Sequence, residues 1–532
     1  MGHSPGNCAA GSGAGDGIVG GINDPTWERA APLADRADDR GVAAPAVRRL
    51  SGPRPPGRTL RPGRRLGRAS ELAAAGLVFV FICGLALLAA LVPVGHGFAP
   101  KGGGWFIPAV FGGVFTLHPL LVAVPWAACF VAGLLDWQHP WRAAHLDLLA
   151  LAGFFPVAML ISDDASRAGL WLAAACLSWL FVRLLGAVFG AWQMPELRPS
   201  ISSRRLGLAI LILLLVRIAS LPGGNISDVG MASSLGAWRV LHGHALYGAV
   251  SWLGHGGLRI NHPDSYGPFA YYAYIPFAAI FPAAPAEVAT LLPAMCFDAL
   301  TIAGLHTLGR RLGGPPLANA LVFAYLLYPF PELSLSAQTN DGLIAALCVW
   351  TIVAAERPVA RGLLMAAAAL TKFVPALLAL QFLGSRPGRG RYALTFLAAL
   401  AAMLAWPLAD PGPAQFIRST FGYQLWQRGG GVQYSIWTYL PHTATAARVI
   451  LAAALVLLAL SAMSRRQAQD AREHAALAAA LLIGGQLLLG YWFYNYLTWC
   501  YPVLIIAIVR ARPDQQTART LAHDDATASL PQ

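Results

Sequence analysis

The sequence predicts an all-α integral membrane protein with about 11–13 transmembrane helices, some of them broken or re-entrant, and with interfacial helices in the outer loops. Its 532 residues are 56% hydrophobic and 12% charged, and the mean hydropathy is +0.55. Apolar stretches of about 20 residues recur along most of the chain, and each can cross about 30 Å of hydrocarbon. Basic residues concentrate in the short loops between them, which is typical of a multi-pass membrane protein.

Four segments follow from the composition. Residues 1–70 are rich in Gly, Ala, Pro and Arg, which predicts a disordered basic cytoplasmic tail. Residues 71–200 are expected to form accessory transmembrane helices, and residues 201–512 to form the main transmembrane module. The polar residues 513–532 predict a second disordered cytoplasmic tail.

The predicted spans can be placed by hydropathy and loop charge. Arginines such as Arg205, Arg311 and Arg389 are expected to face the cytoplasm, which places both termini inside and the long polar loops outside. The most apolar spans are residues 72–94, 108–135, 146–162, 169–193, 205–222, 391–410, 446–464, 474–490 and 495–510.

Two regions require broken helices. Residues 267–309 hold enough apolar sequence for two spans but must start outside and end inside. Residues 361–384 look like one span but begin and end at basic loops. Proline removes a helical hydrogen bond, so Pro293 and Pro375 are the expected break points.

Charge and motifs exclude several classes of function. Much of the net charge of +13 lies in the N-terminal tail and in short loops, so no nucleic-acid partner is expected. The cysteines show no CxxC spacing, which argues against a disulfide framework or a metal cluster. Walker A and HExxH motifs are absent from the sequence, and the GxSxG and GxGxxG spacings occur only in the N-terminal tail (residues 2–6 and 15–20), so no soluble cofactor is expected.

Lys372 is the most unusual residue, because it lies in the apolar run RGLLMAAAALTKFVPALLALQFL and the chain has only one other lysine, Lys101. A lysine at the centre of a span costs about 2.5–3.5 kcal/mol, so it requires a partner. A phosphate at the membrane surface is one candidate. The alternative is a side chain that extends to the lipid headgroups.

Asp228 follows closely on a span that ends at Leu221. A carboxylate at this depth is partly desolvated and can deprotonate a hydroxyl group. The alternative is that Ser227 or Asp228 caps the next helix. The segment MASSLGAWRVLHG predicts a short amphipathic helix lying at the interface.

Other polar residues of the outer loops are candidates for sugar contacts. Asp264 and Tyr266 lie in HPDSYGP, where an Asx-turn is the alternative. The spacing of four histidines fits no compact zinc site, so they are interpreted as surface residues: His242, His244, His255 and His262. Gln338, Asn340 and Asp341 can bind sugar hydroxyls, and helix capping by Thr339 or Asn340 is the alternative.

The last outer loops add one cation and several aromatic rings. Arg428 offers a planar fork for a phosphate, and Trp437 offers a face for sugar stacking. Asn495 lies in YWFYNYLTWCYP. An interfacial aromatic belt is the alternative interpretation of the Trp and Tyr residues, although it does not explain Arg428.

Taken in order, these segments resemble the GT-C polytopic glycosyltransferases, and especially the actinobacterial polyprenyl-phosphate-mannose-dependent mannosyltransferases. The resemblance runs from about Arg205 to Arg510 and rests on SDVGMASSLGAWRVLHGHALYG, YGPFAYY, AQTNDGLIAAL, ALTKFVPALLAL, QRGGGVQYSIW and YNYLTWCYP. The chain departs from the relatives' common Tyr-Pro-Pro at Tyr266-Gly267-Pro268, and it carries about four extra spans before Arg205.

The resemblance implies a glycosyltransferase of the bacterial plasma membrane. It would move a sugar, with mannose implied, from polyprenyl phosphate to a lipid or glycan acceptor on the extracytoplasmic face, with inversion and without a metal. Membrane lipids are the other expected partners. Asp228 would be the general base, and Lys372 and Arg428 would hold the donor phosphate. The implied sugar or acceptor contacts are Asp264, Tyr266, Gln338, Asn340, Asp341, Trp437 and Asn495.

Two other functions remain open from the sequence. A transporter or flippase of envelope lipids or glycans also uses broken helices with a buried cation, although its two matching halves are not visible here. A non-catalytic membrane partner in envelope assembly could share the fold. In that case, the side chains of Asp228 and Arg428 would not converge on a cavity.

Overall fold

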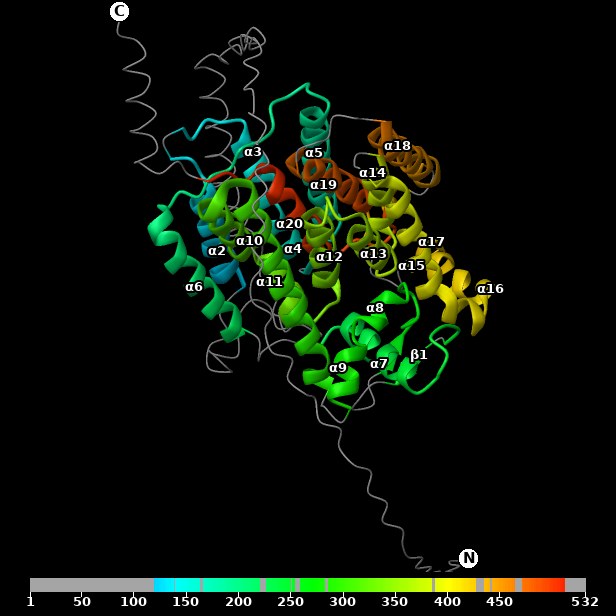
Figure 1. Ribbon diagram of the computed structural model, residues 1–532. Coiled ribbons are helices and arrows are strands. Elements are labelled where there is room, and N and C mark those ends of the chain that lie inside the picture. Colours follow the sequence, from blue (N-terminus) through cyan, green and yellow to red (C-terminus); the bar gives the residue numbers. More distant parts are fainter. Residues whose placement is uncertain are drawn as a thin grey trace, which may run out of the picture. The chain divides into compact units, whose positions relative to one another are not determined.

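The computed structural model describes residues 119–511 except 138, 163–165, 221–225, 250, 254–258, 283–285, 385–387, 427–434, 441–442 and 465–470. The described residues all belong to one compact unit that begins at Leu66. They are largely helical (Figure 1). The strands among them form one short antiparallel pair, in which Trp252 of β1 (Ser251–Leu253) pairs with Ile260 of β2 (Arg259–Asn261).

The first helices are α2 (Pro119–Leu134), α3 (Ala144–Ala152), α4 (Phe154–Ser162), α5 (Ser166–Val188), α6 (Ser203–Ser220), α7 (Asp228–Leu241), α8 (Phe269–Tyr272) and α9 (Ile275–Ile280). The next are α10 (Ala286–Leu327), α11 (Pro329–Ser336), α12 (Asp341–Val353), α13 (Pro358–Ala369), α14 (Leu377–Gly384), α15 (Arg389–Ala409), α16 (Pro413–Ile417) and α17 (Tyr423–Trp426). The last are α18 (Ala444–Ser464), α19 (Ala471–Leu488) and α20 (Leu497–Ile508). Short helical turns are η4 (Val374–Ala376), η5 (Arg418–Gly422), η6 (Ile436–Tyr439) and η7 (Tyr494–Tyr496).

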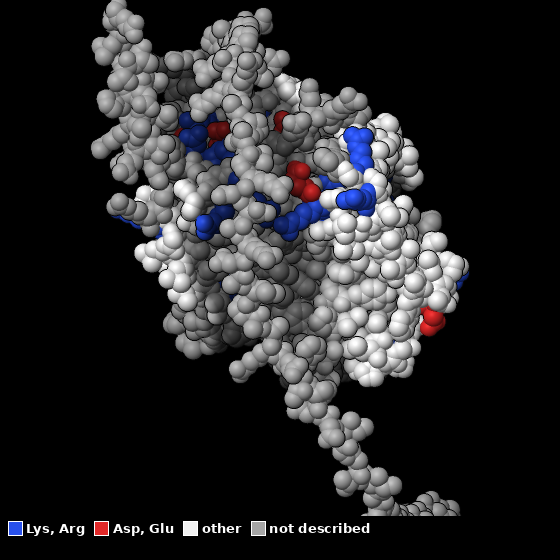
Figure 2. Space-filling view, in the orientation of Figure 1, with Lys and Arg blue, Asp and Glu red and all other residues white. Residues whose placement is uncertain are grey.

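The predicted fold class, an all-α membrane protein, is confirmed. Among the described residues, four helical stretches are long and apolar enough to cross a membrane: Ala168–Val188, Ala289–Leu327, Arg389–Ala409 and Ala444–Met463. Large apolar side chains on the outer helices remain exposed, including Leu394 at 70% and Ile450 at 69%. Figure 2 shows a broad surface almost without charged side chains beside a band in which Lys and Arg gather. Such a surface fits a hydrocarbon environment.

Most predicted spans coincide with helices. The spans placed from residue 169 to residue 222 correspond to α5 and α6, and the four predicted after residue 390 correspond to α15, α18, α19 and α20. The span at 146–162 is divided at Gly153 into α3 and α4. The span at 72–94 lies outside the described residues.

Both regions predicted to hold broken helices are interrupted, the first between α9 and α10, but only the second break lies at the expected proline. Between α13 and α14 the helix stops at Ala369, turns through Lys372 and resumes after η4, which contains Pro375. At Pro293, by contrast, α10 continues as a helix. Neighbouring helices can compensate for a proline in a long helix, so the residue alone does not end it. Non-helical backbone inside α10 occurs at Gly313 and Gly314, where glycine permits a φ of 71° at Gly314.

The central helices are α19 and α20. Every residue of α19 from His474 to Gln486 is buried, as is every residue of α20. A helix that is buried on all sides needs apolar residues on all sides, which explains why these two segments show no amphipathic pattern. α20 packs on α12 and α19. This packing holds the first residues of α20 and of α12 in place.

A buried ion cluster attaches α6 to this core. Arg217, near the end of α6, donates to both carboxylate oxygens of Asp298 of α10 at 2.9 Å and lies 2.6 Å from Glu332 of α11. Tyr325 also donates to Asp298, at 2.7 Å. Charges within an apolar protein are tolerated when they pair in this way. The cluster fixes the end of α6, from which the chain continues to Asp228.

Candidate functional site

α7, α8, α9 and β1 gather at one end of the helical bundle (Figure 1). α7 begins at Asp228 because Ser227 caps it: the Ser227 hydroxyl oxygen accepts a hydrogen bond of 3.0 Å from the backbone N–H of Gly230. The Asp228 carboxylate accepts from the adjacent N–H of Val229 at 2.8 Å, and the residue is exposed. Ser227 therefore supplies the side-chain cap, and Asp228 presents its carboxylate at the surface.

The start of α7 packs against the junction of α11 and α12. The N–H of Ser227 donates to the carbonyl of Ala337 at 3.0 Å, and Asn340 donates through Nδ2 to the hydroxyl of Ser233 at 3.1 Å. Gln338 adopts a left-handed backbone with φ 53°, and its carbonyl lies directly against Gly230. These contacts bring the predicted residues Gln338, Asn340 and Asp341 to the end of the molecule that carries Asp228.

Lys372 lies in the turn between α13 and α14 and is 6% exposed. Its Nζ is 2.5 Å from Oδ1 of Asp341, the first residue of α12. The indole N–H of Trp499 donates to the same oxygen at 2.6 Å. The buried lysine therefore has a protein partner, Asp341, which the sequence had not indicated.

Three aromatic rings enclose the ammonium group. Nζ of Lys372 lies 4.7 Å from the ring centroid of Trp499, 4.8 Å from that of Tyr496 and 5.7 Å from that of Tyr266. An ammonium over aromatic faces gains cation–π attraction, which is stronger away from water. Lys372, Asp341, Tyr266, Tyr496 and Trp499 are called the Lys372 centre below.

Tyr266 links the Lys372 centre to Asp228. The N–H of Phe269 donates to the carbonyl of Leu370 at 3.0 Å, which holds the Tyr266 segment against the lysine turn. Burial, and then the nearby charge of Asp228, raise the pKa of Tyr266 well above its usual range. The Tyr266 hydroxyl therefore remains protonated at neutral pH and can donate a hydrogen bond.

Gly267 is required by close packing. A Cβ added at Gly267 would overlap the carbonyl oxygen of Leu370. Gly267→Ala is therefore expected to displace the lysine turn and to lower the free energy of unfolding by about 1–3 kcal/mol. Thermal unfolding in detergent measures this effect. In the matched control Gly390→Ala, nothing lies within 4 Å of the added Cβ, and no loss is expected. Equal stability of both variants would contradict the packing argument.

Asp264 is buried and connects two segments that are distant in the sequence. Its Oδ2 accepts from the N–H of Gly248 at 2.8 Å and from the hydroxyl of Ser419 in η5 at 2.7 Å. These partners come from distant segments, so Asp264 does more than form the local Asx-turn considered above. A contact with substrate stays a prediction for this residue.

Three predicted site residues remain: Trp437, Asn495 and Arg428. The indole of Trp437 donates to the carbonyl of Leu487 at 2.8 Å, which ties η6 to the end of α19. Asn495 is buried beside Tyr496 in η7, and its backbone carbonyl accepts from the hydroxyl of Ser334. Arg428 falls outside the described residues, so its convergence with Asp228 is untested.

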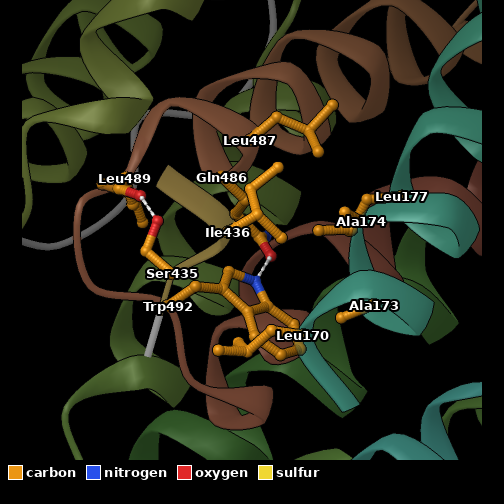
Figure 3. Close-up of a pocket in the computed structure, with 10 residues that line it drawn as sticks. All are labelled: Leu170, Ala173, Ala174, Leu177, Ser435, Ile436, Gln486, Leu487, Leu489 and Trp492. Atoms are coloured by element: carbon orange, nitrogen blue, oxygen red, sulfur yellow. Dashed lines mark hydrogen bonds between the residues drawn. The ribbon is translucent and has the colours of Figure 1, made fainter. Parts of the chain in front are cut away.

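A small, mainly apolar pocket lies between α5, η6 and the end of α19 (Figure 3). Its polar side chains form hydrogen bonds within the protein: Ser435 donates to the carbonyl of Leu489, and Gln486 accepts from the indole of Trp492 (Figure 3). None of the candidate residues lines this pocket. Within the described ranges, no group of three or more His, Cys, Asp or Glu side chains is placed to hold a metal ion.

The sequence interpretation assigned no individual role to Tyr496 or Trp499, for which an aromatic belt was the alternative. Their spacing of three residues places both on one face of a helical segment, and their rings do stack, with centroids 4.2 Å apart. That spacing was a usable signal. The pairing of Asp341 with Lys372 had no comparable signal, because the two residues meet only when the helix breaks between α13 and α14.

No curated protein matches the chain. The model of Glycosyltransferase family 87 matches residues 265–490. The match includes Tyr266, Asp341 and Lys372, whereas Asp228, Tyr496 and Trp499 lie outside it. Residues 265–490 are thus similar to a family of GT-C-type membrane glycosyltransferases, which indicates a glycosyltransferase in the membrane.

Proposed function

We propose that this chain transfers a sugar, with mannose implied by the resemblance, from a polyprenyl-phosphate donor to a lipid or glycan acceptor. Transfer would occur on the extracytoplasmic face of the bacterial plasma membrane and would invert the anomeric carbon. The observation that carries the proposal is the closeness of an exposed carboxylate, Asp228, to Tyr266 of the buried Lys372 centre. The similarity of residues 265–490 to Glycosyltransferase family 87 supports it.

In the proposed reaction, Asp228 takes the proton of the acceptor hydroxyl while the hydroxyl oxygen attacks the anomeric carbon. The bond from that carbon to the phosphate oxygen breaks, and the polyprenyl phosphate leaves with the electron pair. Attack from the side opposite the leaving group gives inversion. Because a phosphate leaves readily once its charge is stabilised, the proposal requires no metal ion.

Lys372 is proposed to stabilise the leaving phosphate. An ammonium has three N–H donors, and only one is needed for Asp341. The carboxylate holds Lys372 in place 2.5 Å away, and a further N–H can donate to a phosphate oxygen. Asp341 also offsets the charge of Lys372, so a second cation is useful, and we propose that Arg428 supplies it.

Two polar groups near Asp228 are proposed to bind sugar hydroxyls. The protonated hydroxyl of Tyr266 can donate. Oδ1 of Asn340 is buried and makes no hydrogen bond with the described part of the chain, so it can accept one. Buried polar atoms normally have partners, which favours a ligand at this position.

The proposal is tested with the purified full chain in liposomes that contain membrane acceptors. Radiolabelled mannose is supplied either as polyprenyl-phosphate mannose or as GDP-mannose. Label is expected to enter the acceptor from the lipid-linked donor only. Transfer from GDP-mannose alone would overturn the donor assignment. Movement of the intact lipid-linked sugar across the bilayer without transfer would instead favour the flippase.

A further inference from the structure

His262 adopts a backbone conformation that histidine rarely takes. Among the described residues, positive φ values outside glycine occur at His262, with φ 48°, and at Gln338, with φ 53°. Gln338 packs against the start of α7 beside Asp228. Such backbone persists only where the surrounding structure holds it, and it is concentrated at functional sites. His262, interpreted above as a surface histidine, is therefore a candidate for a function.

The imidazole of His262 stacks on the ring of Tyr423, the first residue of α17. The ring centroids are 4.3 Å apart and the planes differ by 29°. Two contacts fix the segments that carry these rings: Ser419 donates to Asp264 at 2.7 Å, and Gln424 donates to the carbonyl of Ser265 at 2.9 Å. The stack is thus held in place, and His262 is exposed.

The stack lies near the proposed reaction centre. Gln424, the residue after Tyr423, donates to the carbonyl of Ser265, and the next residue, Tyr266, has its ring beside Lys372. The ring of Tyr496 is one of the three that enclose Lys372. Burial, and then nearby groups that include Asp228 and Tyr423, raise the pKa of Tyr496 well above its usual range, so this tyrosine lies near both the proposed base and the aromatic stack.

We propose that the His262–Tyr423 stack is a subsite for a pyranose ring of the acceptor. The inference rests on the function proposed above, because it uses Asp228 as the base that the bound hydroxyl must reach. A planar aromatic pair offers an apolar face to the C–H groups of a sugar ring, and the imidazole offers a hydrogen-bonding nitrogen at its edge. The stack thereby orients an acceptor hydroxyl toward Asp228.

The test uses His262→Asn in the full-length protein, because asparagine tolerates positive φ but has no ring. Loss of the stacking face is expected to raise the KM for acceptor about 3–10-fold, with kcat and the KM for donor unchanged. Tyr423→Ala is expected to raise the KM for acceptor in the same way. Tyr423→Phe keeps the aromatic stacking face and is expected to behave as wild type. Polyprenyl-phosphate mannose is the donor. Octyl mannoside and mannobiose serve as separate acceptors and distinguish a glycolipid from a free glycan.

His242→Asn is the matched control, because His242 is also exposed and stacks on an aromatic ring, that of Trp238, at 4.1 Å. No change in KM is expected for it. Unchanged acceptor KM in His262→Asn, or a rise confined to the donor KM, would overturn the subsite.

A binding measurement separates this inference from the proposed function. Octyl mannoside or mannobiose is expected to raise the unfolding temperature of the wild-type protein, and to do so less in His262→Asn, without any turnover. If wild type binds in this way but transfers nothing, the proposed function fails and the sugar subsite stands. If neither sugar binds better to wild type than to His262→Asn, the subsite is wrong.

Discussion

Asp228→Asn is expected to lower the turnover number for sugar transfer by about 10²–10⁴-fold, the range typical of a lost general base. The amide has the shape of the carboxylate but cannot take the proton of the acceptor hydroxyl. The fold should be unaffected, because the cap of α7 is the hydroxyl of Ser227, which remains. Steady-state transfer from a polyprenyl-phosphate sugar at saturating donor and acceptor measures the effect.

Asp410→Asn is the matched control for this variant. Asp410 is likewise an exposed carboxylate, at the end of α15, and it takes no part in the proposed reaction. Its replacement should leave turnover unchanged. Full turnover in Asp228→Asn, with normal thermal unfolding of both variants, would remove Asp228 from the mechanism.

Lys372→Met is expected to have the largest effect on stability. Asp341 is 1% exposed, and without Lys372 its charge has no cationic partner in the Lys372 centre. Removal of one partner of a buried ion pair destabilises a protein by about 3–5 kcal/mol. Thermal unfolding in detergent should show this loss, and sugar transfer should disappear with it.

The double variant Lys372→Met with Asp341→Asn distinguishes a structural role of Lys372 from a catalytic role. It removes both charges, and the asparagine oxygen can still accept from the indole of Trp499, so much of the lost stability should return. Transfer should not return, because the leaving phosphate still lacks the proposed stabilisation by Lys372. A double variant that regains both stability and transfer would show that Lys372 serves only the fold.

The helices were predictable because their signals are local. Apolar runs of sufficient length mark α15, α18 and α19, and the polar residue before an apolar run marks the cap at Ser227. The break at Pro375 was also predictable from the basic loops on both sides. The proline signal failed at Pro293, since a helix that is supported by its neighbours can continue through a proline.

The centre of the site was only partly predictable. A buried lysine requires a partner, and that argument correctly singled out Lys372. It could not identify Asp341, because 31 residues separate the two side chains and only the tertiary fold brings them together. The conformation of His262 was also hidden, since a positive φ depends on the contacts that hold the loop and not on the residue alone.

The most direct test of the proposed reaction is the anomeric configuration of its product. The purified chain in liposomes is given a polyprenyl-phosphate mannose of defined configuration and octyl mannoside as acceptor, and the new linkage is determined by NMR. The account predicts a mannosylated product with inverted configuration and release of one polyprenyl phosphate for each sugar transferred. A product with retained configuration would contradict direct attack by a hydroxyl that Asp228 has activated.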